Sequence, residues 1–215
     1  MDETPSQDGA DRVTPLWAAP GRFVLILALA FEGGLVFVAW GLGRALGRWP
    51  PVQWRLDIGS FAWGVLAVAP LLIALQWSRV SDLAPLQRLT RAVSEKVVPL
   101  FAGCSALDLL LISIAAGVGE ELLFRGVIQP HLADWLGPVI GVTLTSLIFG
   151  LVHPVSITYV AYAALVGLYL GVLAAGLENV VVPITTHALY DFLALYFLTR
   201  EASSSVPRGP QDSTR

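Results

Sequence analysis

Charged side chains are scarce in this sequence. They make up 13% of its 215 residues, while hydrophobic residues make up 55%. A soluble domain typically carries about 25% charged residues, so an ordinary soluble domain is excluded and an integral membrane protein is predicted. The net charge of −3 is small, and the 13 Lys and Arg residues form no basic run. Nucleic acid is therefore not an expected partner.

Cysteine is almost absent as well. The single Cys104 lies in an apolar stretch, which excludes an intrachain disulfide and a zinc site built from several cysteines. Two polar segments, residues 1–19 and 201–215, flank the chain and are expected to be disordered tails. Residues 20–200 between them are expected to form one transmembrane domain.

Six apolar segments occupy that domain. A helix needs about 20 residues to cross a hydrocarbon core of about 30 Å, and the first, second and sixth segments reach that length easily. The fourth and fifth are short enough to be tilted, broken or partly re-entrant. The fold class is therefore expected to be all-α, a polytopic transmembrane helical bundle of about six spans. The first segment is too long for a signal peptide and should be retained. The segments are residues 21–43, 58–78, 100–118, 138–153, 158–176 and 180–199.

Residues 79–99 follow a different pattern. Leu86, Leu89, Val93 and Val97 fall on one helical stripe, and the charged residues of this stretch lie off it. Such an amphipathic helix either lies in the membrane interface or forms an elbow packed on the bundle. The pattern is compatible with both arrangements.

Basic residues indicate the orientation in the membrane. With a cytoplasmic amino terminus, nine Arg and Lys residues lie inside and three outside, which favours cytoplasmic placement of both termini. The plasma membrane is the expected location. The inner residues are Arg12, Arg22, Arg79, Arg88, Arg91, Lys96, Arg200, Arg208 and Arg215, and the outer ones are Arg44, Arg48 and Arg55.

Three charges lie close together in the apolar stretch Gly117-Val-Gly-Glu-Glu-Leu-Leu-Phe-Arg-Gly126. Ionisable residues at membrane depth are costly and usually have a function. Glu121 and Arg125 share a helix face and are expected to pair. Glu120 is rotated from Glu121 by about 100°, so it remains free to act as a general base on a water. The alternative is a structural ion triad that holds a helix end.

Two further motifs contain histidine. Phe149 and His153 lie one turn apart, and Pro154 predicts that the helix ends at His153, at a mouth or a break. A single histidine at such a position is more often a buried residue with its hydrogen bonds made within the protein than a catalytic one. His187 and Asp191 also share a face, either as a structural pair or pointing together into a cavity. Together the three motifs can activate water and stabilise charge on an attacked carbonyl, which predicts hydrolysis within the membrane.

These motifs resemble those of a known family. Glu120-Glu121-x-x-x-Arg125, Phe149-x-x-x-His153 and His187-x-x-x-Asp191, in this order on successive apolar helices, are similar to the motifs of the CPBP family. That family is also called the CAAX prenyl protease 2 or ABI family and consists of intramembrane glutamic-type proteases. The resemblance covers roughly residues 100–198, including Arg125–Gln129 and Glu178–His187, and does not extend to the first two helices.

The resemblance implies an intramembrane endopeptidase that uses no metal or other cofactor. Water would be activated by a glutamate and a histidine, and the oxyanion would be stabilised by the residues of the third motif. Known members remove C-terminal tripeptides from prenylated CAAX proteins, and many prokaryotic relatives have other substrates. The expected partners are the lipid bilayer and a membrane-associated peptide or protein. The implied catalytic residues are Glu120, His153, His187 and Asp191, and the site-shaping residues are Glu121, Arg125 and Phe149.

The last motif departs from the best-studied pattern, which has Asn where this chain has Asp191. An Asn amide donates to an oxyanion, whereas an ionised Asp cannot. Asp191 is therefore either protonated, or it orients His187 and leaves the donor role to that imidazole.

Other functions are compatible with parts of the pattern. Glu120, His153 and His187 form a two-histidine, one-carboxylate set suitable for zinc, although no His-Glu-x-x-His occurs. Short matches to aspartyl intramembrane proteases (around Tyr190-Asp191, with the motif order reversed) and to rhomboid proteases (Gly103-Cys-Ser105) are weaker. The non-enzymatic alternative is a membrane scaffold or immunity protein that uses the polar cavity for binding.

Two acidic residues remain outside the motifs. Glu32 precedes Gly33-Gly34, where a neighbouring helix is expected to approach closely. It is interpreted as structural, either lining the cavity or pairing with Arg44. Asp108 belongs to no motif.

Overall fold

The computed structural model describes residues 20–49, 51 and 54–204. Every regular element in these residues is a helix, which confirms the predicted all-α fold. Of the two predicted tails, residues 1–19 and 205–215 lie outside the described residues, while residues 201–204 continue the last helix. The elements are α1 (Pro20–Ala45), α2 (Ile58–Leu66), α3 (Val68–Val80), α4 (Ala84–Ala92), the π-helical η2 (Val93–Val97), α5 (Val98–Phe101), α6 (Ala106–Leu123), the π-helical η3 (Phe124–Ile128), α7 (Gln129–Leu136), α8 (Pro138–Leu151), α9 (Ile157–Leu177) and α10 (Val181–Ser204).

The chain is a multi-pass membrane protein. Within the described residues, α1, the combined α2–α3, α9 and α10 are each long and apolar enough to cross a membrane. The count rises to five if the bent pair Ala84–Phe101 and Ala106–Leu136 is one span. Each of the six predicted segments is largely helical, but α8 has only 14 residues. α6 has 18 residues and carries three acids, one in its first turn and the two adjacent glutamates near its end.

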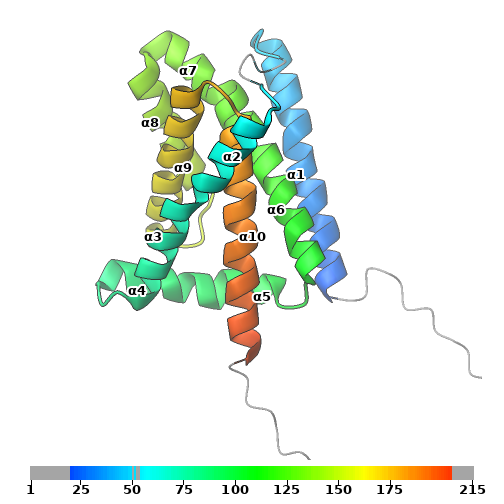
Figure 1. Cartoon of the computed structure of the whole chain (residues 1–215), viewed down its shortest axis with the longest axis vertical. Helices are drawn as coiled ribbons and strands as arrows, with labels where there is room; N and C mark the ends of the chain where they lie inside the picture. The colour runs from blue at the N-terminus through cyan, green and yellow to red at the C-terminus, as the bar shows by residue number, and fades with distance from the viewer. Residues whose placement is uncertain (1–19, 50, 52–53, 205–215) are drawn as a thin grey trace, which may run out of the picture.

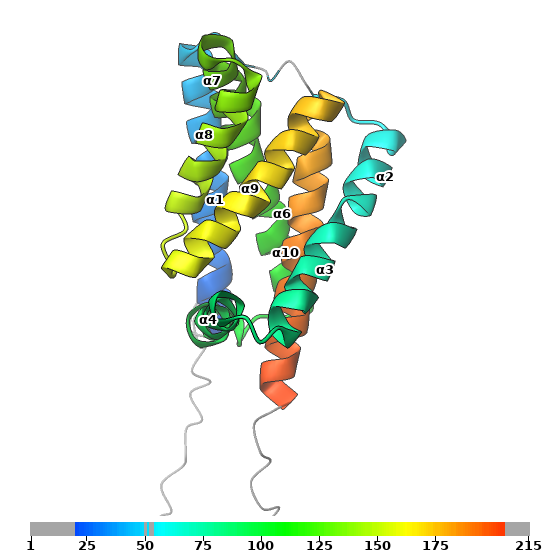
Figure 2. The same cartoon turned by 90° about the vertical axis from the view of Figure 1, so that its left-hand side faces the viewer.

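The helices form a bundle closed at one end by a crossing helix (Figure 1). α6 packs between α1 and α10, α8 packs on α9, and α2–α3 packs on α10. The crossing helix, defined here as α4, η2 and α5, runs across the bundle and is seen along its axis in Figure 2. Its apolar residues Leu89, Ala92 and Val98 are buried, whereas Arg88 and Arg91 are exposed. The predicted amphipathic helix at 79–99 thus lies across the bundle axis and packs on the bundle.

Helix caps explain two acids near the helix starts. Asp57 precedes α2 and accepts a hydrogen bond from the Ser60 amide at 2.9 Å, which lowers the pKa of Asp57. Asp108 forms a capping box at the start of α6, where its side chain accepts from the Ser105 amide at 2.8 Å and the Ser105 hydroxyl accepts from the Asp108 amide. Asp108 therefore has a structural function, which the Ser-x-x-Asp spacing could have predicted.

Glycine allows α1 to approach α6, but at a different position from the one predicted. A Cβ on Gly33 or Gly34 would meet no described heavy atom within 4 Å, so the expectation of a close approach there is wrong. The contact is made instead by Gly119, whose Cα faces the backbone carbonyl of Glu32 so closely that a Cβ would collide with it. The glycine precedes Glu120, so this contact fixes α1 beside the candidate base.

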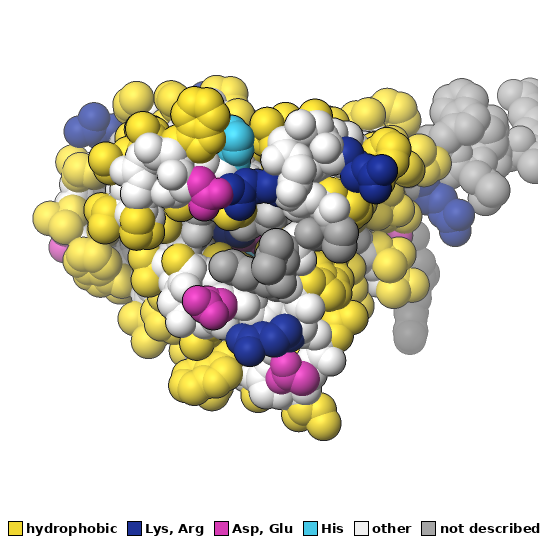
Figure 3. Space-filling view, turned by 90° about the horizontal axis from the view of Figure 1, so that it is seen from above, with side chains coloured by type: hydrophobic (Ala, Val, Ile, Leu, Met, Phe, Trp, Pro, Cys, Tyr) yellow, Lys and Arg dark blue, Asp and Glu magenta, His cyan; other side chains and the backbone are white. Residues whose placement is uncertain are grey.

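The two ends of the bundle differ. The first and last described residues lie at the end crossed by α4 and α5 (Figure 1). At the opposite end, charged side chains gather over the middle of the face and apolar side chains form its rim (Figure 3). There Arg48 forms an ion pair with Asp134, and the Arg55 amide donates to Asn179 Oδ1 at 3.1 Å. An apolar rim around a polar centre is the distribution expected where lipid surrounds the protein.

Candidate active site

α6 ends in the two adjacent glutamates and continues into the π-helical turn η3 at Arg125. π-helical turns are rare and occur frequently at functional sites. The Glu121 and Arg125 side chains are completely buried, and Arg125 Nη1 donates to Glu121 Oε1 at 2.8 Å. This geometry confirms the pairing predicted from their spacing, and it commits Glu121 to Arg125 rather than to the cavity.

α9 contacts Arg125 on the side opposite Glu121. Arg125 Nη2 donates to the Gly167 carbonyl at 2.8 Å, and Gln129 Nε2 donates to the Gly171 carbonyl at 3.0 Å. A Cβ on Gly167 would lie 3.2 Å from Arg125 Nη2, and one on Gly171 would lie 2.7 Å from Gln129 Oε1. The two glycines therefore let α9 approach closely enough for its carbonyls to accept these bonds.

His187 links the third motif to the first. Its Nδ1 lies 2.8 Å from Glu121 Oε1, and its Nε2 lies 3.3 Å from Asp191 Oδ2. Because Glu121 already neutralises Arg125 and accepts from it, Nδ1 is the donor in the first contact. His187 Nε2 then faces Asp191 Oδ2. The contact across 66 residues was not predicted, because no local spacing encodes it.

Glu120 and His153 face each other without direct contact. His153 Nδ1 lies 2.7 Å from the Phe149 carbonyl, which can only accept, so Nδ1 carries the hydrogen. His153 Nε2 is 3.7 Å from Glu120 Oε1. That separation exceeds a direct hydrogen bond and suits one water that contacts both groups. The remaining Glu120 oxygen, Oε2, is buried and has no partner among the described residues.

Phe149 packs at the centre of the site. Its ring lies 4.4 Å from the Arg125 guanidinium carbon and 4.7 Å from the centroid of the His153 ring. The His187 ring lies 6.0 Å away at an angle of 71°. Phe149 is 3% exposed, so its buried ring packs against Arg125 and both histidines and helps to fix their positions.

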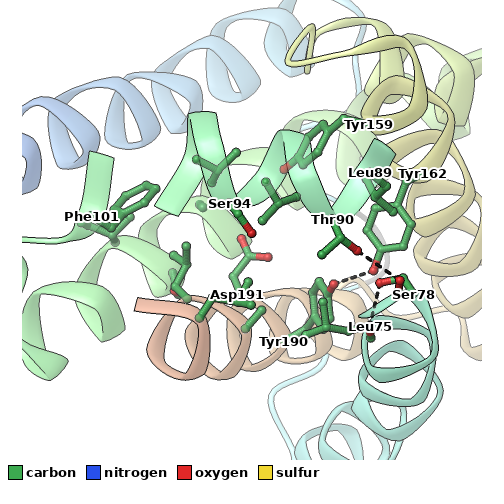
Figure 4. A pocket seen from close by; sticks show the side chains of 18 of the residues that line it. Leu75, Ser78, Leu89, Thr90, Ser94, Phe101, Tyr159, Tyr162, Tyr190 and Asp191 are labelled. Atoms are coloured by element: carbon green, nitrogen blue, oxygen red, sulfur yellow. Dashed lines mark hydrogen bonds between the residues drawn. The ribbon is translucent and has the colours of Figure 1, made fainter. Parts of the chain in front are cut away.

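A cavity of about 240 Å³ lies beside these residues, between the crossing helix and α6, α9 and α10. Glu120 and Asp191 line it, and Asp191 points toward Ser94 of the crossing helix (Figure 4). The Tyr162 and Tyr190 hydroxyls are hydrogen-bonded to each other at its wall. Of the four predicted catalytic residues, Glu120 and Asp191 line the cavity, while His153 and His187 lie behind them, within 3.7 Å of Glu120 and 3.3 Å of Asp191 respectively.

The sequence analysis interpreted Glu32 as structural, either lining the cavity or pairing with Arg44, and the structure places it in the cavity lining with Glu120 and Asp191. Its Oε2 is buried without a partner among the described residues, so the alternative pairing with Arg44 does not form there. The signal was present in the sequence as a lone acid in an apolar helix. Tyr159, whose ring lies 6.5 Å from that of His153, also lines the cavity and had no signal in the motifs.

The comparison with protein families agrees with this geometry. Residues 102–193 match the family model described as type II CAAX prenyl endopeptidase Rce1-like. Residues 102–193 are thus similar to an Rce1-like domain of the CPBP family. No curated protein and no solved structure gave a match.

The Rce1-like match contains all seven motif residues and ends two residues after Asp191. At the level of the family it assigns a membrane-embedded endopeptidase of the CAAX type. Helices α1 to α5 precede the matched residues almost entirely, so Glu32 and the crossing helix are contributed by parts of the chain outside the match.

Proposed function

We propose that this Rce1-like protein hydrolyses a peptide bond in a membrane-associated protein or peptide, with the attacking water held between Glu120 and His153. The observation that carries the proposal is the 3.7 Å separation of Glu120 Oε1 and His153 Nε2 at the edge of the cavity. His153 Nε2 and Glu120 are both acceptors in this state, so one water can donate to each of them. Its oxygen lone pair is then left free for attack.

The proton path follows from these roles. Glu120 takes a proton from the water as the water oxygen attacks the carbonyl carbon of the scissile peptide. The carbonyl oxygen becomes an oxyanion. When the intermediate collapses, the carbon–nitrogen bond breaks and Glu120 returns the proton to the leaving amine. The products are a carboxylic acid and an amine, which exchange a proton in water to become a carboxylate and an ammonium, and no atom outside water and the peptide is consumed.

His187 and Asp191 are the candidates for oxyanion stabilisation. Glu121 fixes Nδ1 of His187, so Nε2 is oriented toward Asp191. A donor held in place in advance stabilises the developing charge without reorganisation, and such a donor contributes about 10²–10³ in rate. Glu121, Arg125 and Phe149 act as positioning residues, because they contact one another or the two histidines and not the water site between Glu120 and His153.

The expected setting is the plasma membrane with both termini in the cytoplasm. The substrate reaches the cavity from the bilayer or its surface, and nothing in the chain requires that it be prenylated. A prenylated substrate depends on a separate enzyme that attaches the prenyl group.

The test compares membrane proteomes of cells that contain the wild-type protein or Glu120→Ala. Peptides whose new ends appear only with the wild-type protein are the expected result, and an exposed acid, Glu95→Gln, serves as a control that should behave as wild type. If no cleavage depends on Glu120, the protease proposal is wrong in that cell. If Glu120→Ala still supports the cellular phenotype, the scaffold or immunity function is favoured. Loss of activity with a chelator would indicate the zinc alternative.

A further inference from the structure

A second hollow lies on the side of the bundle, between the C-terminal parts of α3 and α10. The two helices pack on each other, and both run toward the end crossed by α4 and α5 (Figures 1 and 2). The hollow has a volume of about 640 Å³, and none of the seven motif residues lines it. It is called here the α3–α10 groove, and the lining residues that matter below are Leu72, Leu75, Arg79, Phe197, Arg200 and Glu201.

The groove changes from apolar to charged along its length. On α3 the lining runs from Leu72 to Arg79, and on α10 it runs from Phe197 past Arg200. Seven helical residues rise about 10 Å, which is less than half of a hydrocarbon core of about 30 Å. Trp77, which is 57% exposed, lies near the charged end on α3, and exposed Trp residues gather at the depth of the headgroups. The groove therefore extends from the hydrocarbon region to the headgroups of one leaflet.

The charged end of the groove is basic and only partly neutralised. Arg79 forms an ion pair with Glu201, whose side chain is 58% exposed. Arg200 is exposed and forms no ion pair with a described residue, and its guanidinium carbon lies 5.3 Å from the centroid of the Tyr196 ring. Arginine binds phosphate oxygens through paired donors. Two arginines that share one exposed acid therefore suit a ligand with a phosphate group.

We propose that the α3–α10 groove binds one anionic phospholipid. Its phosphate accepts hydrogen bonds from Arg79 and Arg200, and one acyl chain lies along Leu72 and Phe197. A phosphate joined to a hydrocarbon chain matches both halves of the groove, whereas a free anion matches only one. This end of the bundle is expected to face the cytoplasm, and the cytoplasmic leaflet carries the anionic lipids. All four residues lie outside residues 102–193, so the family match assigns nothing to them.

The groove adjoins the cavity of the candidate site. Leu75, Arg79 and Leu198 line both of them, so a phosphate bound to Arg79 lies at the wall of that cavity. Glu120 lines the cavity but not the groove. Replacing Glu120 by Gln should therefore leave lipid binding unchanged, and the lipid site does not depend on the proposed hydrolysis.

The experiment is native mass spectrometry of the full chain released from dodecyl maltoside micelles, which contain no phosphate. Palmitoyl-oleoyl phosphatidylglycerol is titrated in, with phosphatidylcholine of the same chains and glycerol 3-phosphate as comparisons. We expect one phosphatidylglycerol to bind at least about fivefold more tightly than either comparison, since each basic residue near an anionic headgroup contributes about that factor. Arg200→Gln should remove this preference, and Glu201→Gln should tighten binding several-fold because it removes the competing carboxylate.

Matched controls are Arg88→Gln and Arg91→Gln, which remove exposed charges from the crossing helix outside the groove lining and should keep the wild-type affinity. The proposal is overturned if these controls lose as much affinity as Arg200→Gln, because positive charge anywhere at this end would then suffice. It is also overturned if phosphatidylcholine binds as tightly as phosphatidylglycerol. Equal binding of glycerol 3-phosphate would show a site for soluble phosphates instead.

Phe197→Ala tests the apolar half of the groove. It should weaken binding of phosphatidylglycerol several-fold and leave binding of glycerol 3-phosphate unchanged. The same spectra record the oligomeric state. A dimer that forms without added lipid and is lost in Phe197→Ala would show that a second copy of the chain occupies the groove, and it would overturn the proposal.

Discussion

Glu120 and Glu121 are neighbours in the chain with different environments. Glu121 is fully buried and accepts from both Arg125 and His187. Glu120 lines the cavity and faces His153. The rotation of about 100° between successive helical residues separates the two carboxylates, so one residue holds the site together and the other is available for chemistry.

Replacing Glu120 by Gln should abolish most of the hydrolysis and leave the fold intact. The amide keeps the size of the side chain but cannot take a proton from water, and general base catalysis contributes about 10²–10⁴ in rate. The measurement is the initial rate of product formation in reconstituted membranes. A variant with wild-type rate would contradict the assignment of Glu120 as base.

Replacing Glu121 by Gln should act mainly on stability. It leaves the buried Arg125 charge without its partner, and breaking a buried ion pair in this way costs about 3–5 kcal/mol in the free energy of unfolding. Reversible unfolding in mixed micelles measures the difference. Glu120→Gln is the matched control and should lose less free energy of unfolding, because Glu120 has no such ion pair. Equal losses in the two variants would show that the pair with Arg125 does not stabilise the fold.

Asp191→Asn should retain activity within about tenfold, because an Asn amide can donate both to His187 Nε2 and to an oxyanion. Asp191→Leu has similar volume and no donor, and it should lose about 10²–10³ in rate, as expected for loss of an oxyanion donor. Rates of both variants are compared under the same conditions. An inactive Asp191→Asn would instead show that the negative charge is needed to orient His187.

Residue spacing predicts one part of this site and not the rest. Glu121 and Arg125 pair within one helix turn, so their contact follows from the sequence alone. The contact of His187 with Glu121, and the placement of Glu32 in the cavity, depend on how α6 packs between α1 and α10. Packing of this kind depends on small residues distributed over several helices. A run of apolar residues contains little sequence pattern from which the packing partners could be predicted.

At the scale of elements, the contact of α1 with α6 depends on Gly119. We expect Gly119→Ala to lower the free energy of unfolding by about 1–3 kcal/mol, the usual range for overpacking, and to reduce activity because α1 and Glu32 are displaced. Unfolding and product formation are measured on the same preparation.

Gly33→Ala is the control on the facing helix. Its Cβ meets no described heavy atom within 4 Å, and Ala is favoured over Gly in helices by about 0.8–1.0 kcal/mol. This variant should be neutral or slightly stabilising. If both substitutions have the same effect, the close approach at Gly119 does not hold the two helices together.

The segmentation into helices was predictable, and the lengths of the spans were less so. The apolar runs correctly predicted α1, α2–α3, α9 and α10. α8 is too short to cross alone, and α6 carries acids that lower its hydropathy. The crossing helix packs on the bundle, as one of the two predicted arrangements requires, since its apolar residues are buried and its charged residues are exposed.

For the whole molecule, the distribution of charge relates the cavity to the two sides of the membrane. Arg22, Arg79, Arg200 and the basic residues of α4 and η2 belong to the end crossed by α4 and α5, and Arg44, Arg48 and Arg55 belong to the other end. Basic residues favour the cytoplasmic side. We therefore expect the cavity, which the crossing helix lines, to lie toward the cytoplasm.

Thiol labelling tests this orientation in intact cells. In a Cys104→Ala background, Glu95→Cys places a thiol on the crossing helix, and Gly176→Cys places one near the opposite end, where a side chain would meet no described heavy atom within 4 Å. We expect a membrane-impermeant reagent to label Gly176→Cys from outside the cell and to reach Glu95→Cys only after the membrane is opened. The opposite pattern would place the cavity toward the outside, and substrates would then have to be sought among exported peptides rather than cytoplasmic proteins.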